Sequence, residues 1–263
     1  MNDPHVVALV YKIEHDDFID YKKAKSFYRD EKAFRLEVAD EIARFEMHRH
    51  FPTIEEADKA LTEYRRAWEF HAQLERGPDT FHLTLDRGKS ELIDRKSTSG
   101  CKSLNMSASI GGFSVSMNLR VQPQVYPEPP SNITLNPDVE TMYNRYMGYR
   151  KGRELLPSMA NFCLTVLEDS VGAKNSKRKV AAKKYGIAKR VLNEIGKLTD
   201  SKGGKEARKG KGIGKDFSTA ERRFLEHAVN VIIHRMAENP SSDGVLSVIS
   251  MSDMPSLEDN SDS

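Results

Sequence analysis

The chain of 263 residues contains only two cysteines, Cys101 and Cys163, and neither lies in a Cys-x-x-Cys pair. Two cysteines cannot supply the disulfide framework of a small secreted domain. The longest apolar runs, near residues 6–10 and 162–167, are far shorter than the roughly 20 residues that a membrane-spanning helix needs. The N-terminus has no basic region ahead of an apolar core, so no signal peptide is visible. We therefore expect a cytoplasmic protein that does not enter a membrane.

Net charge is small, but it is distributed unevenly along the chain. The sequence carries 41 Lys and Arg residues against 39 Asp and Glu, a formal net charge of +2. Fifteen of the basic residues but only three of the acidic residues lie between positions 173 and 215. Such a local excess is typical of a segment that faces a polyanion, although a solvated linker would have the same composition.

The N-terminal part alternates apolar and polar residues over short stretches, which is the period of a β-strand. We expect a hairpin around residues 39–41 and strands over residues 5–13, 34–38, 42–51, 81–85 and 107–121.

One long helix is expected between the predicted strands. Thr53, followed three residues later by Glu56, is a helix start signal, and Gly77 with Pro78 ends the helix near residue 76. The only tryptophan, Trp68, lies on the apolar side of this helix and is expected in the core.

Residues 122–137 carry five prolines, which exclude a helix or a central strand there. We therefore predict an α+β domain over residues 1–121, with a mostly antiparallel sheet and one long helix, and a proline-rich linker over 122–136. Beyond it, helical periodicity predicts an all-α bundle over residues 137–240. The last residues, 241–263, are rich in Ser and Asp and are expected to form a disordered acidic tail.

The final helix of the predicted bundle, residues 217–239, has its own start signal. Ser218 and Glu221 have the spacing of a capping box, and Pro240 ends the helix. One side of this helix is apolar, and another carries a row of polar residues, Arg223, His227, Asn230 and His234.

Alternation on the predicted hairpin places Glu46, His48 and His50 on one side. Two imidazoles and a carboxylate could bind one metal ion, but the solvated side of a half-buried hairpin would carry the same residues. We predict no metal site, and no motif in the chain predicts a bound cofactor.

Residues 178–195, RKVAAKKYGIAKRVLNEI, resemble a helix-turn-helix DNA-reading unit. Ala182 stands where the first helix must be small, Gly186 stands at the turn, and the second helix would have core residues Leu192 and Ile195. Such a second helix could lie in a major groove, and its nucleic-acid-binding candidates are Lys189, Arg190 and Asn193, with Lys183 and Lys184 on the first helix. Two ordinary bundle helices joined at Gly186 would explain the same residues.

The glycine-rich stretch 203–216 could cradle phosphate with its backbone N–H groups. Its charged candidates for binding nucleic acid are Arg208, Lys209, Lys211 and Lys215. The spacing is not that of a Walker A loop, which would need glycine at position 209 and Ser or Thr at position 216. A flexible connection between two helices is the alternative interpretation.

Arg222, followed five positions later by His227 near the end of a helical bundle, resembles the signature of HEPN-type domains. Those are small bundles in bacterial defence and toxin systems, some of which cut RNA without a metal ion. The resemblance implies that Arg222 stabilises the scissile phosphate and that His227 transfers the proton, with two copies of the motif brought together in a homodimer. The polar residue that usually follows the arginine is here Arg223, and a surface arginine with a half-buried histidine is the alternative interpretation.

The stretches SMANFCLTVLE (158–168), GIAKRVLNEIGKL (186–198) and ERRFLEHAVNVIIHRMAE (221–238) also resemble a group of uncharacterised bacterial proteins named after methylamine utilisation, J type. This resemblance implies the helical architecture but no reaction. The sequence thus predicts that the basic helical part binds RNA, DNA or another polyanion, and cleaves RNA if the HEPN likeness extends to activity. The contrasting prediction is a module that binds an acidic protein partner.

Overall fold

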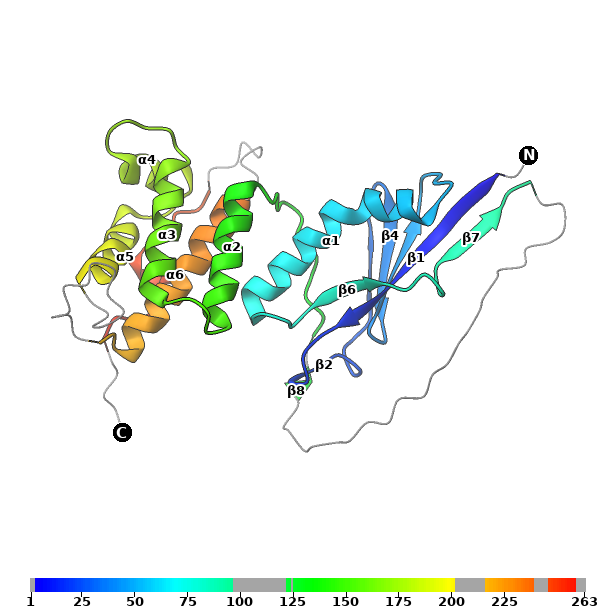
Figure 1. Cartoon of the computed structure of the whole chain (residues 1–263), viewed down its shortest axis with the longest axis horizontal. Helices are drawn as coiled ribbons and strands as arrows, with labels where there is room; N and C mark the ends of the chain where they lie inside the picture. Colours follow the sequence, from blue (N-terminus) through cyan, green and yellow to red (C-terminus); the bar gives the residue numbers. More distant parts are fainter. Residues whose placement is uncertain (1–2, 97–121, 124, 202–215, 239–245, 259–263) are drawn as a thin grey trace. The chain divides into compact units, whose positions relative to one another are not determined.

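The computed structural model describes residues 3–96, 122–123, 125–201, 216–238 and 246–258 (Figure 1). The chain divides into two compact units, Met1–Pro130 and Ser131–Ser263. An antiparallel sheet fills the first unit and helices fill the second, so the predicted α+β class is confirmed at this level.

The sheet of the first unit has the strand order β3-β4-β5-β1-β6, and β7 pairs with β1 on the same side as β6. Neighbouring strands in this sheet run antiparallel. The bounds are β1 (Pro4–Glu14), β3 (Phe27–Asp30), β4 (Phe34–Ala39), β5 (Ile42–Met47), β6 (His82–Leu85) and β7 (Glu91–Asp94). Two short strands, β2 (Ile19–Asp20) and β8 (Gln122–Pro123), pair in parallel.

The predicted hairpin is β4 with β5, and its register follows from the burial of one side. Phe34, Leu36 and Val38 are buried, and the residues between them are exposed. Asp40 and Glu41 both have positive φ, 50° and 60°, which gives a two-residue turn of the kind that matches the right-handed twist of the strands.

Helix α1 (Ile54–Arg76) packs against this sheet and confirms the predicted helix. The Thr53 hydroxyl accepts a hydrogen bond from the Glu56 N–H, as the start signal predicts. Trp68 is fully buried and lies between the rings of Phe81, 4.8 Å away between centroids, and Tyr64. The predicted role of Trp68 as a core residue is therefore confirmed.

The proline-rich segment is not a free linker along its whole length. Tyr126 is 2% exposed, its ring stacks on Tyr21 at 5.0 Å, and its hydroxyl accepts from the Glu41 N–H. The indole N–H of Trp68 donates to the Pro127 carbonyl oxygen. Prolines cannot enter a sheet ladder, but their carbonyl groups accept hydrogen bonds, so residues 125–130 complete the first unit. The first compact unit extends to Pro130 and so includes part of the predicted linker.

The second unit contains α2 (Pro137–Arg150), α3 (Leu156–Asp169), α4 (Lys177–Lys184), α5 (Lys189–Ser201) and α6 (Thr219–Ala237). Helix α3 packs against each of the other four, and α6 also packs against α2 and α5. The predicted capping box is present: the Ser218 hydroxyl accepts from the Glu221 N–H, and the Glu221 carboxylate accepts from the Ser218 N–H. Across the described ranges, no helix is both long and apolar enough to cross a membrane.

The predicted disordered tail is partly ordered. Residues 246–258 are described, Ile249 forms a parallel β-bridge with Ile187, and Met254 is 7% exposed. A short 3₁₀ helix, η2 (Met251–Asp253), follows the bridge. Apolar residues in this part of the tail pack on the helical unit, although the Ser- and Asp-rich composition of the tail predicts disorder. The other residues of the predicted tail, and the strand predicted over 107–121, lie outside the described residues.

Replacing Tyr126 with alanine in the intact chain tests whether residues 125–130 belong to the core of the first unit. We expect Tyr126→Ala to lower the free energy of unfolding by about 3 kcal/mol, because it removes a buried ring and leaves its cavity. The measurement is urea denaturation of both proteins. The control is Val125→Ala, since the neighbouring Val125 side chain is 71% exposed and should matter little. Equal losses for both variants would mean that the segment does not belong to the core.

Candidate nucleic-acid interface

Helices α4 and α5 are joined by residues 185–188, and both pack on α3 (Figure 1). The first helix is short, with Ala181 fully buried against its neighbours. The second helix is longer and buries an apolar side consisting of Val191, Leu192, Ile195 and Leu198. The two helices are thus joined by a short turn, and both are supported by α3.

Gly186 determines the turn between the two helices. Its φ is +60°, in the left-handed region that glycine adopts without strain. A Cβ at this position would lie 2.9 Å from the Leu246 Cβ and 3.1 Å from the Ser247 carbonyl oxygen. Both the backbone conformation and the close approach of the C-terminal segment therefore require glycine.

The exposed side of α5 is polar and basic. Lys189, Arg190, Asn193 and Lys197 are exposed and fall within an arc of about 100° around the helix. Lys197 pairs with Glu194 at 3.1 Å. Lys189 and Arg190 form no hydrogen bond or ion pair with any residue that the structure describes. The start of α5 thus presents two exposed cations that pair with none of the described residues.

The first turn of helix α4 carries positive charge, which the helix dipole disfavours at that end. Its first turn carries Lys177, Arg178 and Lys179 and no acidic residue, although the N-terminus of a helix dipole is positive. Ser176 precedes the helix in a left-handed conformation, and its side chain makes no capping hydrogen bond. These features weaken the start of the helix, whereas Lys183 and Lys184 in its last turn have the charge that the helix dipole favours there.

Two of these cations hold the unit together. Lys177 pairs with Asp169 at 2.6 Å, and the Arg178 guanidinium pairs with Glu168 at 2.5 Å. The same guanidinium donates to Asn193 Oδ1 at 3.3 Å and lies against Gly196, where a Cβ would come within 3.1 Å of it. Arg178 therefore ties α3, α4 and α5 into one body.

The described nucleic-acid-binding candidates all lie on α4 and α5, and all are exposed: Lys183, Lys184, Lys189, Arg190 and Asn193. Lys184 donates to the Ser170 carbonyl oxygen at 3.4 Å, and Lys183 contacts no described residue through a hydrogen bond or ion pair. The glycine-rich loop with Arg208, Lys209, Lys211 and Lys215 lies outside the described residues.

Arg222 and His227 both lie on α6, about 140° apart around the helix axis. Arg222 is half-buried, with its guanidinium carbon 5.7 Å from the centre of the Phe217 ring, and His227 is exposed. Between them, Glu226 accepts a hydrogen bond from Tyr149, and burial together with this bond raises the pKa of the Tyr149 phenol. One helix therefore does not direct both groups at the same phosphate, and Glu226 beside His227 would repel one.

The Glu46, His48 and His50 side chains are not gathered around one point. The Glu46 carboxylate pairs with Arg44 at 3.3 Å, while the His50 ring stacks on His5 at 5.3 Å. In the part of the chain that the structure describes, no group of three or more His, Cys, Asp or Glu side chains could hold a metal ion.

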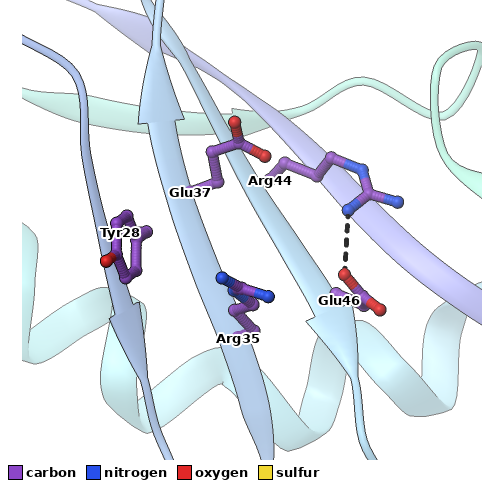
Figure 2. A pocket seen from close by; sticks show the side chains of 5 residues that line it. All are labelled: Tyr28, Arg35, Glu37, Arg44 and Glu46. Atoms are coloured by element: carbon purple, nitrogen blue, oxygen red, sulfur yellow. Dashed lines mark hydrogen bonds and ion pairs between the residues drawn. The ribbon is translucent and has the colours of Figure 1, made fainter.

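A hollow of about 260 Å³ lies on the solvent side of the sheet, and Figure 2 shows the side chains that line it. In the strand register, Arg35 stands opposite Glu46, and Glu37 stands opposite Arg44. Arg44 also pairs with Glu91 at 3.1 Å. The hollow is thus the polar side of a half-buried sheet whose opposite charges lie close together, which is a common way of stabilising paired strands.

Cys163 is a buried thiol rather than a nucleophile. Its side chain is fully buried on α3, and burial raises the pKa of the thiol to about 12. Because the thiolate is the reactive form of cysteine, this residue is not poised for nucleophilic catalysis.

Two features of the interface were not predicted as such. Lys179 is exposed beside Lys183 on α4 and forms no ion pair with a described residue. Residues 246–254 lie across the α4–α5 turn. The apolar residues Leu246, Ile249 and Met254 are the sequence signal that could have predicted this packing.

No family model, curated protein or solved structure matches the chain. The resemblances to HEPN-type domains and to the methylamine-utilisation group therefore stay predictions. Function has to be argued from the described side chains.

His5 makes the stability of the first unit depend on pH. Its side chain is 8% exposed and its Nδ1 atom has no hydrogen-bond partner. Burial, and then the nearby Arg95 and His50, lower the pKa of His5 from its usual 6.5, against the opposing effect of Asp3. As pH falls through 6.5, His5 takes up a proton in the unfolded chain but resists protonation in the folded chain. The free energy of unfolding that His5 contributes above this pH is therefore lost.

We therefore expect the free energy of unfolding to fall as pH drops from about 7.5 to about 5.5, and to fall less in His5→Gln. Denaturant titrations at several pH values measure this slope. His48→Gln is the matched control, because His48 is exposed in the neighbouring segment. A slope that is the same in the wild type and in His5→Gln would contradict the assignment to His5.

Proposed function

We propose that the helical unit binds nucleic acid through α4 and α5, with α5 entering the major groove of duplex DNA. The observation that carries this proposal is the set of exposed cations without a described partner on two helices that are joined at Gly186: Lys179, Lys183, Lys189 and Arg190. Internal ion pairs do not account for this charge, and a polyanion would neutralise it.

The side chains of α5 suit base edges. A major groove about 12 Å wide admits one α-helix, and the N-terminal half of a recognition helix is the part that reaches the bases. Arg190 has the geometry to donate twice to guanine, and Asn193 can both donate to and accept from adenine. Both residues are exposed.

The side chains of α4 suit the phosphate backbone. Lys179, Lys183 and Lys184 are exposed on a helix of eight residues that contains no acidic residue. Phosphate contacts of this kind fix the position of a protein on a duplex but carry no sequence information. In this proposal α4 supplies affinity and α5 supplies base contacts.

The test is a triple variant of the lysines of α4 that would contact phosphates, Lys179→Gln, Lys183→Gln and Lys184→Gln, measured with labelled duplex DNA across a salt series. We expect affinity at about 0.1 M salt to fall by tenfold or more, and the slope of log K against log salt to become shallower by about three units. Each lost phosphate contact removes one released counterion, which is why the slope changes.

The matched control removes three exposed lysines of the first unit, Lys22→Gln, Lys23→Gln and Lys25→Gln, and changes net charge equally. Equal effects of both triple variants would mean that only net charge matters. Absence of binding to DNA and RNA at low salt would leave an acidic protein partner as the better explanation. Tighter binding to RNA than to duplex DNA would favour the HEPN-like version over the helix-turn-helix version.

RNA cleavage by Arg222 and His227 is the second candidate function. The exposure of His227 and the partial exposure of Arg222 favour it, because both groups can be reached by a substrate. Since the two side chains diverge on α6, the reaction would need a second copy of the chain to place one Arg222 near the other His227.

We expect Arg222→Ala with His227→Ala to abolish any RNA cleavage by the purified protein, measured on a structured RNA by gel electrophoresis. The matched control is Arg223→Ala with His234→Ala, which changes the same residue types on the same helix. Equal cleavage by the two double variants, or none by the wild type, ends the enzymatic version.

A further inference from the structure

The last described segment of the chain lies across the turn of the proposed nucleic-acid site. The Ile249 N–H donates to the Gly186 carbonyl oxygen at 2.8 Å, and the Ala188 N–H donates to the Ile249 carbonyl oxygen at 2.8 Å. Residues 187 and 249 therefore form a parallel β-bridge. We name residues 246–254 the strap. It contacts the turn directly before Lys189 and Arg190, the two cations of α5 that pair with no described residue.

A buried arginine on α6 holds the other end of the strap. Arg235 is 9% exposed, and its guanidinium donates to the Ser247 carbonyl oxygen at 2.9 Å and to the Ser247 hydroxyl at 3.3 Å. It also pairs with Glu238 at 2.8 Å. Breaking the bonds of a buried guanidinium is costly, so the strap is part of the folded unit.

The strap does not act as an internal substitute for a polyanion. Its carboxylate, Asp253, accepts from the Ser250 N–H at 2.8 Å, and this bond lowers the pKa of Asp253. Within the described residues no ion pair joins Asp253 to Lys189 or Arg190. The Asp253 carboxylate therefore shapes the strap and does not neutralise the cations of α5.

We infer that the strap is a positioning element of the nucleic-acid site: it fixes the α4–α5 turn and so sets the direction in which α5 presents Lys189 and Arg190. The inference rests on the proposed function. The turn offers one carbonyl and one N–H, at Gly186 and Ala188, that the helices do not use, and the strap pairs both. A site fixed before binding loses less conformational entropy when the ligand arrives.

The experiment compares Ile249→Pro with wild type in the full chain. Proline removes the N–H that donates to Gly186. The control is Val248→Pro, since Val248 is 64% exposed and its N–H donates to no described residue. Ile249→Val keeps the N–H and should rescue binding. The readouts are duplex DNA affinity across a salt series and hydrogen exchange at the Ala188 amide.

We expect Ile249→Pro to bind duplex DNA about tenfold more weakly, with the same salt slope and faster exchange at Ala188. The slope is retained because every cation is still present. If Ile249→Pro does not fold, a chain that ends after residue 245 should give the same loss.

Equal or tighter binding by the strap variants, with wild-type protein binding normally, overturns the inference and leaves the proposed function standing. Tighter binding would mean that the strap masks the site. Weaker binding with a shallower salt slope also overturns it, because the strap would then supply phosphate contacts itself. Absence of DNA binding by the wild type overturns both proposals.

Discussion

Burial of α6 is the interaction on which the helical unit depends. Buried residues occur on most sides of this helix, from Ala220 to Ala237, and the capping box at Ser218 fixes where it begins. Helix α3 packs on α6, α4 packs on α3, and α5 packs on both α3 and α6, so this core supports the two helices that carry the basic surface. A central helix covered by its neighbours supplies most of the apolar burial in a bundle, which allows peripheral helices to carry charge that does not help them fold.

Helix α4 shows what that support permits. With three cations in its first turn and no capping side chain at Ser176, an isolated peptide of this sequence would be a poor helix. Ala181 buried on one side and Arg178 bonded to Glu168 on another hold it in place. The first turn of α4 therefore disfavours a helix, and tertiary contacts hold it in the helical conformation. Such disagreement between local preference and tertiary structure concentrates where a surface serves binding rather than stability.

Sequence reasoning succeeded where the deciding interaction is local. The starts of α1 and α6 depend on Thr53 and Ser218 bonding to residues three positions away, and the side of α5 that carries Lys189 follows from helical periodicity. It failed where the partner is distant. Tyr126 belongs to the first unit because it stacks on Tyr21, 105 residues earlier, and its carbonyl neighbours accept from α1. Neither proline content nor tail composition contains that information.

The charge that remains on α4 and α5 is a property of the fold and not only of composition. Carboxylates of the helical unit are already engaged with structural cations, as in the pairs Glu168 with Arg178, Asp169 with Lys177, Glu194 with Lys197 and Glu238 with Arg235. Surface ion pairs of this kind add little stability, but they decide which cations stay unneutralised. Among the described residues, no carboxylate pairs with Lys179, Lys183, Lys189 or Arg190, which lie on adjacent helices around one glycine turn. Because like charges brought together in this way repel one another, the arrangement gains stability when an extended anion binds across it.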